Sequence, residues 1–218
     1  PVLRDAMPAW DPGGKYLYFL YHRDFDPVYD GLQYDLKFPR GSRPHLLTLQ
    51  KDLPSPFVPT PKPPKKDKGD EAKADGKDKK EDAKDDKKKE EAKEVVIDLE
   101  GLSGRVVAFP LPEGRYLRVL GASGKALFTS TPIAGSLDRN FYATAPSAKA
   151  VLKSYDLESR ETKTVCERVS DFELSRDHST LGIQAGLSVR VVAATETVDS
   201  AKDSESFGRK SGFVDLAR

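Results

Sequence analysis

Three histidines, one cysteine and many serines are the side chains of this sequence that could take part in nucleophilic catalysis. A serine or cysteine nucleophile needs a nearby base and oxyanion donors. His178 and Ser179 are adjacent in LSRDHSTLGI, where the sequence indicates a turn, and neighbouring side chains on a strand point to opposite faces. The sequence contains no Gly-x-Ser-x-Gly elbow. We therefore interpret His178 and Ser179 as turn residues.

The sequence around His22, His45 and Cys166, the other candidate bases and nucleophile, indicates structural roles for them. His22 ends a predicted strand and His45 begins one, so each is expected to be structural or solvent-exposed. Cys166 lies in TKTVCERV, whose alternation is typical of a strand, so a packed core thiol is expected. A single cysteine excludes an internal disulfide and a site with several cysteine ligands. The sequence therefore predicts no catalytic, cofactor-binding or metal-binding residue.

The segment DFDPVYDGLQYD gathers acids that could suggest a calcium site. Its acids are Asp24, Asp26, Asp30 and Asp35. Their spacing lacks the loop pattern and the terminal glutamate of an EF-hand. We therefore interpret the segment as a connecting loop between structural units.

Composition excludes two classes of partner. The sequence has 36 Lys and Arg against 35 Asp and Glu, whereas a nucleic-acid binder usually shows a basic excess. No apolar stretch approaches the roughly 18 residues of a membrane span. The sequence does not show a charged segment followed by an apolar stretch at its start, which is the pattern of a signal peptide. We expect neither a nucleic-acid nor a membrane partner, and we interpret the start at Pro1 as that of an excised or processed piece.

Residues 62–94 form a low-complexity charged insert with 13 lysines and 12 acids. Alanine is its only aliphatic residue, so it buries too little surface to offset chain entropy and is expected to be disordered. The interleaved acids cancel the field of the lysines within a Debye length of about 8 Å. The insert divides the chain into a first part, 1–61, and a second part, 95–218. Together these hold 23 basic and 23 acidic residues, as an ordinary folded domain would.

Outside the insert, short apolar runs bounded by turn residues predict an all-β fold. Tyr16–Tyr21 is aromatic and too short for a helix, which indicates a strand covered on both faces. Further strands are predicted at residues 43–50, 95–99, 105–109, 116–120, 126–130, 140–144, 150–155, 162–169, 171–174, 180–184 and 188–193. No helical periodicity of convincing length occurs outside the insert.

A loose internal repeat favours a β-propeller over a sandwich. WDPGGKYLYF from Trp10, LGASGKALFT from Leu120 and LSRDHSTLGI from Leu174 each place a turn before a strand of similar length. The residues suffice for about three four-stranded antiparallel blades, whereas a closed propeller needs at least about four. The predicted fold is therefore a partial β-propeller, which is an open arc or part of a ring completed by other sequence.

Several segments resemble one known family, in the expected order. VVIDLEGLSGRVVAFPLPEGRY (residues 95–116) is similar to a stretch of tricorn proteases that reads isoleucine-aspartate, a glycine turn, arginine and a proline-flanked strand. AWDPGGKYLYFLYHRDFDPVYD (9–30) and KDLPSPF (51–57) match the same region upstream. GRKSGFVDLAR (208–218) resembles the exit from the second propeller of the family. The chain thus resembles the C-terminal half of the second β-propeller of a tricorn-like serine peptidase.

The resemblance implies a non-catalytic role in proteolysis. Tricorn-type proteins are large cytoplasmic serine peptidases of prokaryotes that cut oligopeptides and assemble as oligomers. Two β-propellers precede a helical region, a PDZ-like domain and a catalytic domain, and no residue here matches a catalytic position. The implied function is substrate gating and scaffolding. The resemblance implies that the chain is part of a larger tricorn-like peptidase, which we call the parent. The implied partners are oligopeptides, the remaining blades and catalytic domains of the parent, and further copies of the parent.

Aromatic residues of the DFDPVYDGLQYD loop are the predicted ligand contacts. Phe25, Tyr29 and Tyr34 would touch peptides that pass a propeller mouth. Two alternatives stay open. The chain could be a free-standing propeller-like module that binds proteins or peptides without a link to proteolysis. It could also belong to a peptidase of the prolyl oligopeptidase type, against which the stretch at residues 95–116 argues.

Overall fold

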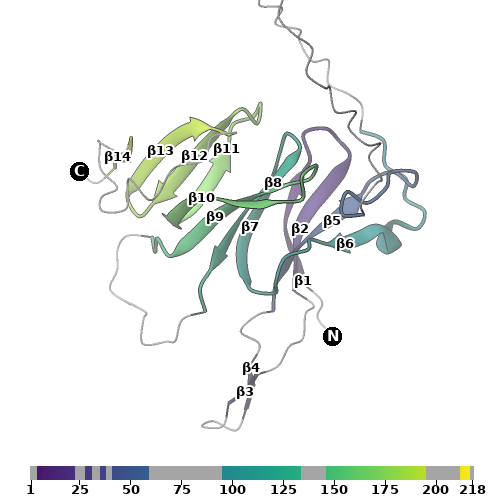
Figure 1. Cartoon of the computed structure of the whole chain (residues 1–218), viewed down its shortest axis with the longest axis horizontal. Coiled ribbons are helices and arrows are strands. Elements are labelled where there is room, and N and C mark those ends of the chain that lie inside the picture. Colours follow the sequence, from purple (N-terminus) through teal and green to yellow (C-terminus); the bar gives the residue numbers. More distant parts are fainter. Residues whose placement is uncertain are drawn as a thin grey trace, which may run out of the picture.

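A computed structural model describes residues 4–22, 28–30, 35–37, 41–58, 95–133, 146–194 and 212–216. The insert predicted at 62–94 and the strand predicted at 140–144 lie outside these residues. The described residues form three four-stranded antiparallel sheets, which lie side by side in Figure 1. The prediction of an all-β fold with three four-stranded, propeller-like sheets is confirmed.

Each large sheet follows the order of its strands along the chain. The first sheet contains β1 (Arg4–Trp10), β2 (Tyr16–His22), β5 (Arg43–Thr48) and β6 (Val106–Ala108). The second contains β7 (Arg115–Ala122), β8 (Lys125–Thr131), β9 (Ala150–Asp156) and β10 (Thr162–Val169). The third contains β11 (Asp171–Leu174), β12 (Thr180–Ala185), β13 (Ser188–Ala193) and β14 (Val214–Asp215). A 3-10 helix, η1 (Leu102–Arg105), precedes β6, and β3 (Val28–Asp30) pairs with β4 (Asp35–Lys37) in a separate hairpin.

Strand β2 carries apolar side chains on both faces, as its unbroken apolar run predicts, and one of these faces is only partly covered. Three consecutive residues, Tyr18, Phe19 and Leu20, are buried. Because successive side chains of a strand point to opposite faces, burial of all three requires cover on each side. Tyr18 and Leu20 pack toward the second sheet, whereas Phe19 packs with Leu47 and Leu49 on the other face.

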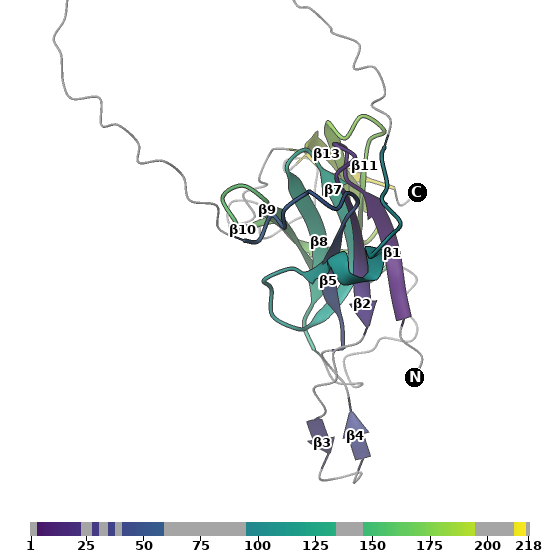
Figure 2. The ribbon, with the colours of Figure 1, turned by 90° about the vertical axis from the view of Figure 1, so that its right-hand side faces the viewer.

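The core lies in two layers between the sheets. Between the first and second sheets, aromatic residues dominate, with Tyr18 and Phe109 facing Phe128 and Tyr155. Between the second and third sheets, aliphatic residues dominate: Leu127, Leu152, Val165 and Val169 face Phe172, Leu181, Ile183 and Val192. Figure 2 views the molecule from the side of the first sheet, with β1 and β2 in front.

The internal repeat corresponds to the first hairpin of each sheet. The turns join β1 to β2, β7 to β8 and β11 to β12. Each contains a residue with positive φ: Gly14 at 66°, Gly124 at 67° and His178 at 57°. The hairpins also pair alike, since Trp10 lies opposite Leu17, Leu120 opposite Leu127 and Leu174 opposite Leu181. The prediction of one turn-and-strand unit per sheet is therefore confirmed.

The strand predicted at Val95–Leu99 is wrong. The position beside β5 is taken by β6, so the segment has no ladder to join within the described part of the chain. It is attached at Asp98, whose backbone N–H donates to Leu49 O at 2.9 Å and whose carboxylate accepts from Lys51 N at 2.8 Å. Gly101, with φ of 68°, then leads into η1. High β propensity is therefore not enough for a strand here, because β6 already occupies the place beside β5.

Strand β6 completes the first sheet from beyond the insert. It pairs with β5, so the predicted insert lies in the connection between the third and fourth strands of one sheet. Residues 56–58, which come before the insert, are held against the second sheet by Arg160. Its guanidinium donates to Pro56 O at 3.2 Å and to Val58 O at 3.0 Å. Phe57 of the same segment packs on Phe109 with ring centroids 4.9 Å apart.

Candidate functional site

Only one of the three predicted peptide contacts lies in the described part of the chain. Tyr29 is the central residue of β3, whereas Phe25 and Tyr34 lie outside the described residues. The hairpin of β3 and β4 projects away from the three sheets (Figure 1). It joins β2 to β5, which pair within one sheet, so the interpretation of this segment as a loop that connects two structural units, here two blades, is wrong. The peptide contacts themselves stay a prediction.

His178 and Ser179 lie in a turn and do not face each other as a base and a nucleophile would. The Ser179 hydroxyl donates to Asp177 Oδ2 at 2.7 Å. The His178 Nδ1 lies 3.0 Å from Gly121 O, a carbonyl of the second sheet, to which it can only donate. Ser179 is therefore held by a carboxylate and His178 by a neighbouring sheet, which confirms the interpretation as turn residues.

Hydrogen bonds in this turn hold the pKa of Asp177 down to about 2, with the Ser175 hydroxyl as the largest cause and the Ser179 hydroxyl next. The sign follows from linkage: this contribution to stability is complete above the unfolded pKa of about 4 and is lost as pH falls toward 2. We expect Ser175→Ala to raise the pKa of Asp177 measurably in an NMR pH titration. Asp156 is the internal control, because its pKa is lowered by Ser159 and Glu158 of another turn and should not move. An unchanged Asp177 midpoint would contradict this assignment.

The remaining candidates are packing residues. His45 is buried, lies with its ring 4.2 Å from that of Tyr21, and has Nδ1 3.1 Å from Arg43 O. Cys166 is buried in the core between the second and third sheets, as predicted. His22 is the half-buried last residue of β2. Among the described residues, no group of three His, Cys, Asp or Glu is arranged to hold a metal ion.

The first strands of the three sheets meet along a line that we call the inner edge, defined as β1, β7 and β11. Each is an end strand of its sheet in the described structure, and β7 contacts both β1 and β11. A Cβ at Gly121 would lie 2.5 Å from Trp10 O, which places the end of β7 against the end of β1. Arg118 of β7 reaches β11, with Nη1 3.0 Å from each carboxylate oxygen of Asp171, and also pairs with Glu173.

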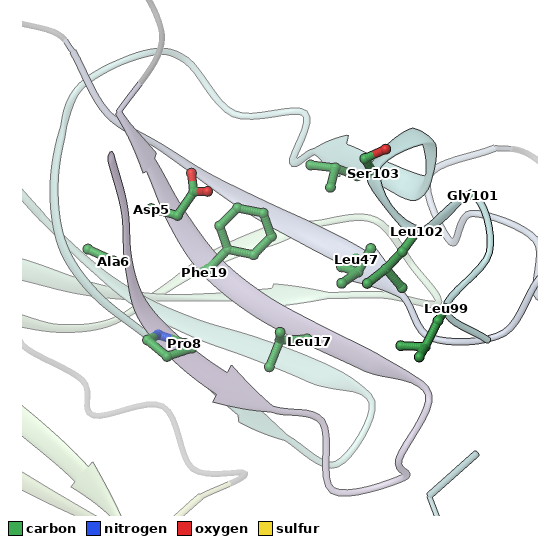
Figure 3. A pocket seen from close by; sticks show the side chains of 11 residues that line it. Asp5, Ala6, Pro8, Leu17, Phe19, Leu47, Leu99, Gly101, Leu102 and Ser103 are labelled. Atoms are coloured by element: carbon green, nitrogen blue, oxygen red, sulfur yellow. The ribbon is translucent and has the colours of Figure 1, made fainter. Parts of the chain in front are cut away.

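A groove of about 600 Å³ lies on the face of the first sheet that points away from the second sheet. Leu17 and Phe19 of β2 and Leu47 of β5 form its floor, and Leu99 and Leu102 rise beside Leu47 at one end (Figure 3). Asp5, Ala6 and Pro8 of β1 line the other side (Figure 3). We call the surface made by Leu17, Phe19, Leu47 and Val106 the open face. The sequence carried a signal for it, namely the apolar residues on both faces of β2.

The described residues include no helix with the length and apolar character needed to cross a membrane.

Comparisons with known proteins point to one family. A family model described as the tricorn protease second beta propeller domain matches residues 1–195. The chain is 31% identical over 219 residues to a tricorn protease homolog of Saccharolobus solfataricus, covering 100% of this chain and 17% of that protein. It is 32% identical over 216 residues to a putative tricorn protease homolog 2 of Streptomyces coelicolor, covering 98% of this chain and 17% of that protein.

A solved structure shows the same fold. The crystal structure of the tricorn protease matches with a TM-score of 0.63 at 23% identity, covering 93% of this chain and 17% of that chain. The alternative of a prolyl oligopeptidase-type propeller is not supported, since the relatives named here are tricorn proteases. The chain spans 17% of the length of the two relatives. Because the match with the second-propeller model covers residues 1–195, the chain belongs to the tricorn protease family.

Proposed function

We propose that this chain is a non-catalytic propeller segment of a cytoplasmic tricorn-type serine peptidase that degrades oligopeptides. It has two roles in the parent: its open face binds a neighbouring sheet, and its inner edge and β3–β4 hairpin contact peptides on their way to catalytic residues elsewhere in the parent. The open face carries the proposal, because it is an apolar packing surface in a chain that spans only part of its relatives' length.

The strand register supports the first role. Trp10 opposite Leu17 in the first sheet corresponds to Leu174 opposite Leu181 in the third. By this correspondence Leu17 and Phe19 are the counterparts of Leu181 and Ile183, which are fully buried against the second sheet, whereas Leu127 at the same position of the second sheet faces the third. The same two positions of the first sheet line a groove. A further four-stranded sheet with branched aliphatic side chains would bury them as the second sheet buries Leu181 and Ile183.

Thiol reactivity tests this role. We expect a cysteine introduced by Leu17→Cys to react with a maleimide in the isolated chain and about tenfold more slowly in the parent protein, because a buried thiol is inert. Lys163→Cys is the control: its side chain is 64% exposed on β10, and it should react alike in both. Equal reactivity of Leu17→Cys in chain and parent would show that nothing covers the open face.

The second role predicts binding without cleavage. Phe25, Tyr29 and Tyr34 are the proposed contacts in the segment between β2 and β5, and β1, β7 and β11 provide those on the inner edge. We propose that the parent acts as a homo-oligomer, with the catalytic domains as partners of this segment. Oligopeptides incubated with the whole chain should bind and remain intact in a mass spectrum.

A further inference from the structure

Two apolar side chains on the inner edge stand in β-bulges. The pairing of β1 with β2 is interrupted between Ala6 and Ala9, where Met7 lies, and that of β7 with β8 is interrupted between Tyr116 and Arg118, where Leu117 lies. Met7 is 52% exposed and Leu117 is 44% exposed. Bulges re-aim side chains and are over-represented beside functional sites. At its bulge, each of β1 and β7 therefore carries an apolar side chain, Met7 or Leu117, that the described sheets leave partly exposed.

The backbone of Met7 adds an independent sign of function. Met7 has φ of 54°, in the left-handed region that an unbranched non-glycine residue rarely adopts. Residues held in such conformations cluster at binding and active sites. Methionine is also flexible and polarizable, which suits a surface that receives side chains of different shapes. Met7 is the only methionine in the sequence.

Contacts between the sheets place these residues at one level of the inner edge. Trp10 O lies against Gly121, so these two residues mark the same height on β1 and β7. Met7 comes three residues before Trp10, and Leu117 and Arg118 come four and three residues before Gly121. Met7 is therefore expected at the height of Leu117 and Arg118. Arg118 in turn binds Asp171 of β11. By the shared hairpin register, Asp171 precedes Leu174 by the same three residues that separate Met7 from Trp10. By this count Met7, Leu117 and Asp171 occupy corresponding positions on the three strands.

The charge at this level is negative. Arg118 is bound by both Asp171 and Glu173, and two carboxylates facing one guanidinium leave one negative charge in excess. These carboxylates are exposed, at 54% and 65% of their side-chain surface. A ligand that covers Met7 and Leu117 would therefore gain from a positive charge beside its apolar group.

We propose that this part of the inner edge binds oligopeptides that carry a large apolar side chain next to a positive charge. The apolar side chain packs on Met7 and Leu117, and the amino terminus or a lysine or arginine side chain faces Asp171 and Glu173. An extended peptide can also pair its backbone with the exposed edge of β1 or β7. The proposal rests on the peptide-contact role proposed above and names the class of peptide.

Fluorescence of Trp10 provides the test. It is the only tryptophan, is 54% exposed, and lies at the end of β1 three residues from Met7. Three hexapeptides are titrated against the whole chain: one with leucine beside lysine, one with serine in place of leucine, and one with glutamate in place of lysine. We expect the first to bind most tightly, by about tenfold, since partial burial of a leucine contributes about 1.5 kcal/mol.

Variants locate the contact. Met7→Ser and Leu117→Ser should each weaken the leucine-lysine peptide about fivefold, and Glu173→Gln should reduce its advantage over the glutamate peptide. Leu216→Ser is the matched control: Leu216 is 59% exposed, follows β14 and lies outside the inner edge. Circular dichroism verifies that each variant is folded.

The outcomes separate this inference from the proposed function. Two results would overturn the inference while the peptide-contact role stands. The three peptides could bind the chain equally well, or Met7→Ser and Leu117→Ser could change the affinity no more than the control Leu216→Ser does. If none of the peptides binds, as judged by Trp10 emission and by equilibrium dialysis, both fail.

Discussion

Gly121→Ala is expected to destabilise the chain by about 3 kcal/mol, near the upper end for overpacking of a close contact. A Cβ at this position would lie 2.5 Å from Trp10 O and 2.8 Å from Tyr18 Cε2. The first neighbour is backbone and the second belongs to a buried ring whose hydroxyl donates to Asp11 at 3.3 Å. Neither can move away without separating β7 from β1. Urea denaturation followed by circular dichroism measures the loss.

Gly104→Ala is the matched control for this prediction. It makes the same chemical change, but no described atom lies within 4 Å of the position its Cβ would take. Gly104 lies in η1, and its φ is not positive. We expect its free energy of unfolding to change by less than about 0.5 kcal/mol, as for other surface substitutions. Equal losses in the two variants would mean that the close approach of the first two sheets does not determine stability.

Phe109→Ala is expected to lower the free energy of unfolding by about 4 kcal/mol, the range for truncating a buried aromatic residue. Phe109 is fully buried at the centre of the first core layer. Its ring centroid lies 4.9 Å from that of Phe57, 5.3 Å from that of Tyr155 and 6.0 Å from that of Tyr18. The cavity would open where three segments meet.

The variant also has a local consequence that simple loss of stability would not produce. Phe57 packs on Phe109 in the segment before the insert. We expect hydrogen exchange near Phe57 to rise under conditions where the third sheet remains protected, because local opening requires less free energy than global unfolding. Leu216→Ala, at a position 59% exposed, is the control and should leave exchange and stability unchanged. A uniform increase over all three sheets would contradict a local role for Phe109.

Strands with strong local signals were predicted well. The aromatic run at Tyr16–Tyr21, the turn at Gly14 and the hairpin repeat depend on side-chain burial and on backbone angles within about ten residues. Such signals are present in the sequence itself. Val95–Leu99 misled, because its β-branched residues carry the propensity of a strand but β6 occupies the place beside β5. Strands β1 and β14 were not predicted at all.

The candidate site was predicted less well. Phe25, Tyr29 and Tyr34 were chosen because they are aromatic and lie in a loop, and the structure describes only the backbone of Tyr29. Met7 and Leu117 carried no local signal, since a bulge depends on the register between two strands. The ion pair of Arg118 with Asp171 joins residues 53 positions apart, and no spacing rule predicts it.

The sequence alone was enough to determine the fold class, the three repeated hairpins and the family, because these follow from local periodicity, turn residues and linked motifs. The tertiary structure alone decided which faces are covered. It left Leu17 and Phe19 in a groove while their counterparts Leu181 and Ile183 are buried. It also brought β1, β7 and β11 together so that Met7 and Leu117 lie level with an excess of carboxylate charge. Burial and charge pairing depend on neighbours distant in the chain, and only the packed sheets supply them.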